Sequence, residues 1–212
     1  MKKTRALVYV ALFAALIAAG AFLQIPVPPV PFTLQSFFCL LTGSLLGPWL
    51  GTLSVLIYLA AGLIGLPVFT QGGGFSYLFM PTFGFLLGLI PTALLSGLFM
   101  RRAAGLKGAG GTVARAALLF ACSALLLLIG FFYYVLLNQV PGAELWGVFV
   151  SFVLLFLPAE AVKAAAASVL FGALGRYFPE SLGRTAGVTQ PEKAERDPHR
   201  QEEDSTAGKE DR

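Results

Sequence analysis

Long apolar segments, separated by short proline-rich, glycine-rich or charged breaks, make up most of the chain. A helix needs about 20 apolar residues to cross the hydrocarbon core of a bilayer, and most of the segments approach that length. We therefore predict an all-α membrane protein with six transmembrane helices, at residues 6–23, 33–46, 49–66, 82–100, 113–137 and 158–177. The second helix is short for a full crossing, so we expect it to be tilted or shielded by its neighbours.

Three breaks between the first four helices resist helix formation. They read "QIPVPPVP" at 24–31, "GPW" at 47–49 and "LPVFTQGGGFSYLFMP" at 66–81. Proline lacks an amide donor and glycine is conformationally loose, so the backbone of these segments is left without regular partners. Such backbone survives at membrane depth only where it is buried in protein or lines a cavity.

The apolar stretch 145–157 is too short to cross a membrane, and we interpret it as a separate helix at or dipping into the outer surface. Pro158 is then the first residue of the last crossing, a position where proline is well tolerated. This places Glu160 and Lys163 in the first turns of that helix, near the outer face. A single helix running unbroken from Leu145 would place both residues far deeper.

The composition excludes an ordinary soluble fold. Only 12% of the residues are charged and 57% are hydrophobic, whereas about 25% of the residues of a soluble domain are charged. No Asp, Glu, Lys or Arg occurs between Arg5 and Arg101. A removable signal peptide is the alternative for the start of the chain, but the run 6–23 is long enough to span and lacks a clear cleavage site.

Basic residues form three groups that predict the topology. They are Lys2, Lys3 and Arg5 before the first helix, Arg101, Arg102, Lys107 and Arg115 after the fourth, and Arg176 and Arg184 after the sixth. Six crossings put all three groups on one side, so the positive-inside rule predicts that both termini are cytoplasmic. The net charge of +4 thus reports topology in a cell membrane and not binding to nucleic acid.

The composition becomes highly charged from about Thr189 onward. We therefore divide the chain into a membrane domain at 1–184 and a disordered cytoplasmic tail at 185–212. The only histidine, His199, lies in this tail, and Cys39 and Cys122 are isolated in apolar segments. We expect no metal site and no catalytic residues.

Glu160 and Lys163 are the candidate ligand-binding pair. Residues three apart share a helix face, so both side chains can point into the bundle. Ionisable groups within membrane helices usually mark a ligand or a pathway, although a neutralised pair that only sets packing is the alternative. Lys163 and the amides of a helix start could receive a carboxylate, and Glu160 could accept hydrogen bonds from ligand N–H groups.

Further candidates lie in the loops and on the first helix. Gln35 could bind a ligand or a neighbouring helix, and the loop "TQGGGFSY" could offer backbone amides to a ligand. The substrate-binding candidates in this loop are Gln71, Gly72, Gly73, Gly74, Ser76 and Tyr77. Ala11, Ala15 and Ala19, four residues apart, allow another helix to approach closely, either within the bundle or from a partner.

Several motifs together resemble the BioY family, the biotin-binding S components of energy-coupling factor (ECF) transporters. They are "IPVPPVPFTLQSFF", "GSLLGPWLGTLSVLIYLAAGLIGLPVF", the glycine loop followed by "PTFGF", and "FLPAEAVKAA". The likeness extends from the first helix to about Tyr177. The family opens its last helix with a proline-glycine-aspartate-x-x-lysine motif, and here Ala159 replaces the glycine and Glu160 the aspartate.

The resemblance implies an S-component bundle that binds biotin near the outer face and has no cofactor of its own. Its partners would be the lipid bilayer, a membrane coupling protein and a pair of ATPases that use ATP. The stripe of Ala11, Ala15 and Ala19 resembles the surface on which S components dock. The departures at Glu160 and in the glycine loop leave open a different small vitamin or a biotin precursor as ligand.

Two other classes of function are weighed against this. An intramembrane protease or lipid transferase needs a nucleophile with a base, or a metal cluster, and the membrane part has one carboxylate and no histidine. A purely structural scaffold would explain the hydrophobicity but would give no role to Glu160, Lys163 and the irregular loops.

Overall fold

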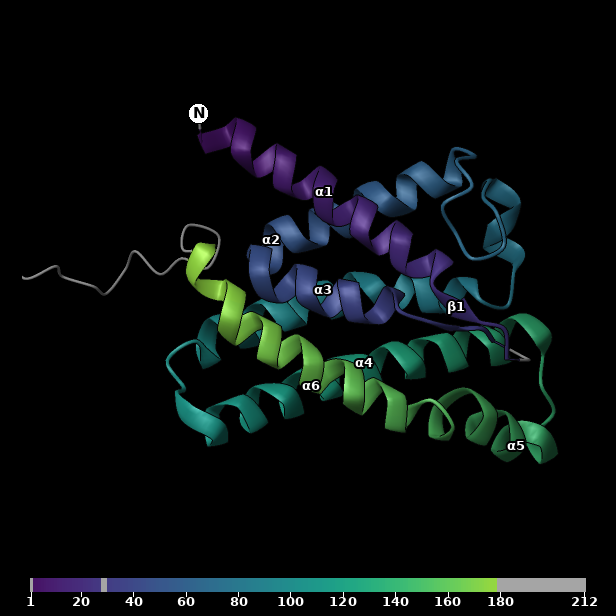
Figure 1. Cartoon of the computed structure of the whole chain (residues 1–212). Helices are drawn as coiled ribbons and strands as arrows, with labels where there is room; N and C mark the ends of the chain where they lie inside the picture. The colour runs from purple at the N-terminus through teal and green to yellow at the C-terminus, as the bar shows by residue number, and fades with distance from the viewer. Residues whose placement is uncertain (1, 28–29, 179–212) are drawn as a thin grey trace, which may run out of the picture.

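The computed structural model describes residues 2–27 and 30–178, which form a helical bundle (Figure 1). The tail predicted at 185–212 lies outside the described residues. The elements are α1 (Lys2–Phe22), β1 (Gln24–Ile25), β2 (Phe32–Thr33), α2 (Gln35–Leu63), η1 (Phe75–Phe79), α3 (Phe83–Ala103), α4 (Gly108–Asn138), η2 (Gly142–Glu144), α5 (Leu145–Phe149), η3 (Val150–Leu154), α6 (Leu157–Leu174) and η4 (Gly175–Tyr177).

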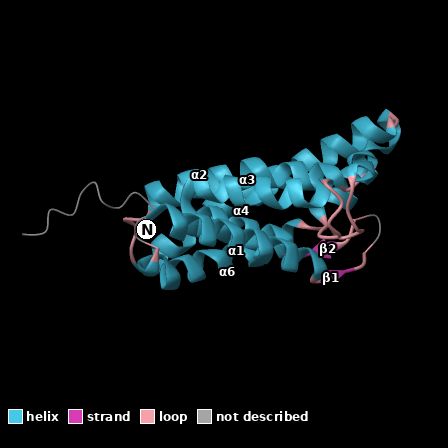
Figure 2. Ribbon diagram, turned by 90° about the horizontal axis from the view of Figure 1, so that it is seen from above, coloured by secondary structure: helices cyan, strands magenta, loops and turns pink. Residues whose placement is uncertain are grey.

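The predicted class of helical membrane protein is confirmed. Five helical segments of the described chain are long and apolar enough to cross a bilayer: Thr4–Phe22, Gln35–Leu63, Phe83–Ala103, Gly108–Asn138 and Gly142–Leu174. α2 packs on α1 and α3, α3 packs on α4, and α4 packs on α6. The bundle has two distinct ends (Figure 2). The loop end carries β1, β2 and η1, and the basic end carries the start of α1 and the α3–α4 connection.

α2 contains a reversal of the chain. Gly47 has φ 81° and ψ 176°, a conformation almost restricted to glycine, and Pro48 follows it. Figure 1 shows the first arm of α2 running from the loop end to the basic end and the second arm running back. The break therefore lies where "GPW" predicted it. The two predicted helices, 33–46 and 49–66, are nevertheless joined in one element, so the structure does not confirm six separate helices.

The two arms of α2 lie in close contact because their facing residues lack side chains. A Cβ atom on Gly51 would lie 2.8 Å from the Cα of Gly43, and a Cβ on Gly43 would overlap the backbone of Ala93 in α3. The reversal itself packs against Gly97 of α3, near the basic end. These contacts hold the two arms of α2 against each other and against α3.

The prediction of a separate surface helix at 145–157 is wrong. Leu155 and Phe156 have helical φ and ψ angles, so the chain continues from α5 through η3 into α6. The hydrogen-bond pattern changes locally, as the bond from Leu155 N to Val150 O shows. Pro158 is tolerated because it stands in the first turn of α6, where its missing N–H is not required. Glu160 therefore stands inside one long helical segment, Gly142–Leu174, and not in the first turns of a separate crossing.

Candidate functional site

A cavity lies inside the bundle, between the β1–β2 hairpin, the loop around η1, and helices α2, α3, α4 and α6. It offers about 570 Å³ of space, including its mouth. The lining residues are Val30, Pro31, Thr33, Gln35, Ser36, Thr70, Tyr77, Thr82, Phe85, Leu86, Leu89, Leu126, Leu127, Phe156, Glu160 and Lys163.

Glu160 and Lys163 meet in this cavity as a buried ion pair. The Nζ atom of Lys163 lies 2.7 Å from the Oε1 atom of Glu160, and the residues are 7% and 2% exposed. Lys163 also donates to the backbone carbonyl of Thr33 at 2.7 Å and to the hydroxyl of Ser36 at 3.0 Å. The hydroxyl of Ser36 donates in turn to Glu160 Oε1 at 2.9 Å. The ion pair of α6 is thereby tied to β2 and to the start of α2.

The hydrogen-bond network satisfies Lys163 fully but Glu160 only in part. An ammonium group has three N–H donors, and Thr33, Ser36 and Glu160 provide three acceptors for Lys163. The second carboxylate oxygen, Glu160 Oε2, is buried and has no hydrogen-bond partner within the described chain. A buried acceptor without a partner is unfavourable by about 1–3 kcal/mol, more if charged. The free polar group of the site is therefore an acceptor that suits an N–H donor.

Ser36 is the member of this network that the sequence analysis missed. Its position next to Gln35, at the start of an apolar helix, was the available signal. Serine in a membrane helix, however, often bonds to its own backbone, as Ser44 does to the carbonyl of Leu40. Only the fold, which brings Ser36 to a residue 124 positions away, reveals its role.

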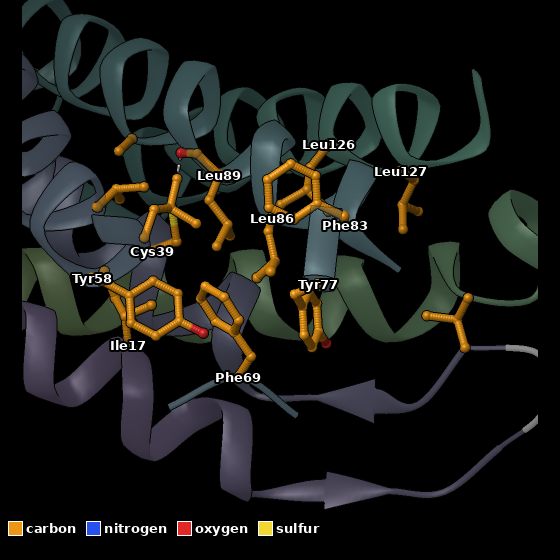
Figure 3. Packing of buried hydrophobic residues seen from close by; sticks show 14 of the residues in the cluster. Ile17, Cys39, Tyr58, Phe69, Tyr77, Phe83, Leu86, Leu89, Leu126 and Leu127 are labelled. Carbon is orange, nitrogen blue, oxygen red and sulfur yellow. Dashed lines mark hydrogen bonds between the residues drawn. The ribbon is translucent and has the colours of Figure 1, made fainter. Parts of the chain in front are cut away.

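Apolar and aromatic side chains surround the ion pair. The Nζ atom of Lys163 lies 4.3 Å from the centre of the Phe32 ring, which stacks on Phe156 at 5.5 Å. Four leucines of the buried cluster shown in Figure 3 also line the cavity: Leu86, Leu89, Leu126 and Leu127. The site thus combines one charged locus with a large apolar wall.

Gln35 and Tyr77 are the two other predicted residues that line the cavity, and each takes part in a hydrogen bond of a tyrosine hydroxyl. Gln35 donates to the hydroxyl of Tyr58 at 2.9 Å, and Tyr58 donates to the carbonyl of Val68. The hydroxyl of Tyr77 lies 2.9 Å from that of Thr70. Through these bonds the loop after α2 is fastened to the bundle next to the cavity.

The remaining loop candidates do not line the cavity: Gln71, Gly72, Gly73, Gly74 and Ser76 are absent from its wall. The backbone amide of Gly72 donates to the carbonyl of Phe69 and that of Gly74 to the carbonyl of Gly62, so these amides serve the loop's own fold. Gly73 lets the loop approach α2 closely, because a Cβ atom there would overlap the carbonyl oxygen of Leu66 and lie 3.0 Å from that of Gly62.

Ala11, Ala15 and Ala19 lie together on the exposed face of α1. They do not pack inside this bundle, so the interpretation of the stripe as an internal packing surface is wrong. Among the described residues there is also no group of three or more histidine, cysteine, aspartate or glutamate side chains that could hold a metal ion.

A bundle of membrane helices that encloses a cavity of mixed apolar and polar lining, with a buried carboxylate oxygen that has no partner among the described residues, is the arrangement of a membrane protein that binds a small molecule. The comparisons agree, and they identify the family. The chain belongs to the BioY family, because it matches the model of that family over residues 1–180. It is a multi-pass protein of the cell membrane.

Relatives and a solved structure support this assignment. A biotin transporter BioY from Rhodobacter capsulatus is 34% identical over 186 residues, which are 82% of this chain and 94% of the relative. A probable biotin transporter BioY from Lysinibacillus sphaericus is 54% identical over 101 residues, but this match spans only about half of that relative, 52% of its length. The crystal structure of the S-component for biotin from an ECF-type ABC transporter superposes with a TM-score of 0.72 and 30% identity, covering 82% of this chain and 93% of that one.

Proposed function

We propose that this protein is the substrate-capture (S) subunit of an ECF-type uptake transporter and that it binds biotin in the cavity around Glu160. The family, whose relatives are named transporters and not enzymes, supports this proposal. The single observation that carries the choice of ligand chemistry is the Oε2 atom of Glu160, a buried acceptor in the cavity with no partner among the described residues.

Biotin matches these features group by group. Its ureido ring carries N–H donors that can reach a free carboxylate oxygen, and its thiophane ring and chain suit the leucine and phenylalanine wall. Its own carboxylate would be repelled by Glu160 Oε2, so we propose that the ureido ring and not the carboxylate lies at the ion pair. Lys163 then orients Glu160, in place of the carboxylate-binding role that the sequence suggested.

Blocking a ureido N–H of the ligand is expected to weaken binding about 10- to 150-fold, because a hydrogen bond to a charged group contributes about 1.5–3 kcal/mol. Titration of the purified protein with biotin and with N-methylated biotin measures this. Biotin amidated at its carboxylate is the control and should lose less. The opposite order would return the carboxylate to Lys163. Binding of a biotin precursor or another vitamin in preference to biotin would favour the alternative ligands.

The topology and the partners follow from the same proposal. Both arms of α2 would cross the membrane, giving six crossings with both termini in the cytoplasm and the cavity reached from outside. A membrane coupling protein and a pair of ATPases would supply the energy, since this chain carries no nucleotide-binding motif. The exposed stripe of Ala11, Ala15 and Ala19 would be the docking surface for the coupling protein.

Ala15→Leu is expected to abolish most uptake in cells while leaving biotin binding by the isolated subunit within about twofold, because a side chain added to the outer face of α1 reaches no neighbour inside the bundle. Uptake assays and titration measure the two properties. A leucine at Ala173, on the exposed face of α6, is the matched control. Equal loss of uptake and binding would contradict a docking role.

A further inference from the structure

The short helix η1 has two different faces. Tyr77 points inward, is 2% exposed and forms part of the cavity wall. Phe75 and Phe79, two residues before and after it, are 71% and 75% exposed. Two exposed phenylalanine rings on the outer face of a ligand-site loop are unfavourable in water, because each leaves a large apolar surface uncovered.

The length of α2 sets the depth of this loop. The reversal at Gly47 lies at the basic end, packed against Gly97 of α3. From Pro48 to Leu63 the second arm is about 16 residues, or roughly 24 Å at 1.5 Å per residue. The hydrocarbon core is about 30 Å thick, so an arm that starts at its inner boundary ends short of its outer boundary. The loop packed on that end then lies at the outer interface and not in bulk water.

The loop itself is suited to that depth. It lies within the stretch between Arg5 and Arg101 that contains no Asp, Glu, Lys or Arg. Its backbone forms internal hydrogen bonds: the amide of Phe69 donates to Gly72, and the hydroxyl of Tyr133 in α4 donates to the carbonyl of Leu78. Irregular backbone near the lipid is stable only when it is paired within the protein in this way.

The exposed rings also continue a surface that faces lipid. The second arm of α2 exposes Leu53, Leu56 and Ile57, and the stripe extends to Ile64 beyond the helix. The amide of Gly74 donates to the carbonyl of Gly62, so η1 begins beside this end of the stripe (Figure 1). The apolar surface therefore runs from the membrane-facing side of α2 onto η1 without a charged residue.

We propose that η1 lies in the outer membrane interface, with Phe75 and Phe79 inserted among the upper acyl chains of the lipids. The bilayer then supports from outside the wall of the cavity that Tyr77 forms from inside. The occupant of this surface is the lipid and not a protein partner, because the surface continues the lipid-facing stripe and lacks any charged group for specific docking.

Tryptophan fluorescence in nanodiscs of phosphatidylcholine tests this proposal without any ligand, so its outcome is separate from the proposed function. Trp49→Phe and Trp146→Phe provide a tryptophan-free background, to which Phe75→Trp or Phe79→Trp is added. Lipids brominated near the top of the acyl chain should quench either tryptophan more than lipids brominated near the chain end. The emission should also be shifted to shorter wavelength.

Two matched tryptophans calibrate the result. Ile57→Trp, on the exposed face of α2, should be quenched by the deeper bromines, and Ala143→Trp, next to the charged Glu144, should be quenched least. Using two positions in η1 guards against one variant that fails to fold, which size-exclusion chromatography reports. If both η1 tryptophans behave like Ala143→Trp, η1 lies in water and the proposal is overturned. Quenching like that of Ile57→Trp would also overturn it.

Discussion

Lys163→Ala is expected to weaken ligand binding by at least about 100-fold. Removing one partner of a buried ion pair destabilises the folded protein by about 3–5 kcal/mol, and here the remaining partner is the group that binds the ligand. The substitution removes the donor to Thr33 and Ser36 and leaves Glu160 buried, with no cation beside it. The carboxylate that presents Oε2 to the ligand would then turn or take up a proton. Isothermal titration with biotin measures the binding, and thermal unfolding in detergent measures the stability.

A double substitution separates the structural contribution from the ligand contribution. Glu160→Gln with Lys163→Met keeps side chains of similar length and removes both charges, so no unpaired charge remains. We expect this variant to be more stable than Lys163→Ala but still to bind biotin weakly, because a neutral amide is a poorer acceptor than a carboxylate. Binding by Lys163→Ala at the wild-type level would show that the pair only sets packing.

Gly43→Leu is expected to have the largest effect on folding. Overpacking a well-packed interior destabilises by about 1–3 kcal/mol, occasionally more, and here the added side chain would overlap the backbone of Ala93, which cannot rotate away. The first arm of α2 would be pushed from α3, and Ser36 at its start would move from Glu160. We expect little folded protein in membranes and no biotin binding.

Gly110→Leu is the matched control for this prediction. Gly110 also lies in a helix, the first turn of α4, but a Cβ atom there would meet no other atom within 4 Å. The same substitution should therefore leave the yield of folded protein and the melting temperature close to wild type. A folded, biotin-binding Gly43→Leu protein would show that the arms of α2 do not need their close contact with α3.

Most helices could be predicted because a helix that crosses the bilayer needs about 20 largely apolar residues in a row. The predicted segments 82–100 and 113–137 match α3 and α4, whose bounds are Phe83–Ala103 and Gly108–Asn138. α4 extends further at both ends because glycine and polar residues can remain helical outside the apolar run. The error at 145–157 has a different origin, because a local change in hydrogen-bond pattern allowed the helix to continue where length alone predicted a break.

The site could be predicted in part. The contact between Glu160 and Lys163 follows from their spacing on one helix, and Gln35 and Tyr77 do line the cavity. The loop glycines were assigned to the ligand because a glycine loop looks the same in sequence whether its amides face a ligand or its own chain. Ser36 and Phe32 were not recognised, since neither carries a distinctive local pattern.

By itself the sequence determined that this is a membrane protein of apolar helices, that the chain breaks at Gly47, and that one charged pair lies among apolar residues. These properties depend on residue type and on spacing along a few turns. Only the tertiary structure decided which of the two charged groups keeps an atom without a hydrogen-bond partner. Lys163 receives its other two acceptors from Thr33 and Ser36, 130 and 127 positions away, whereas Glu160 Oε2 receives no donor from the described chain. Hydrogen bonding and desolvation depend on distance in space, so they were settled only when α2 and β2 packed against α6.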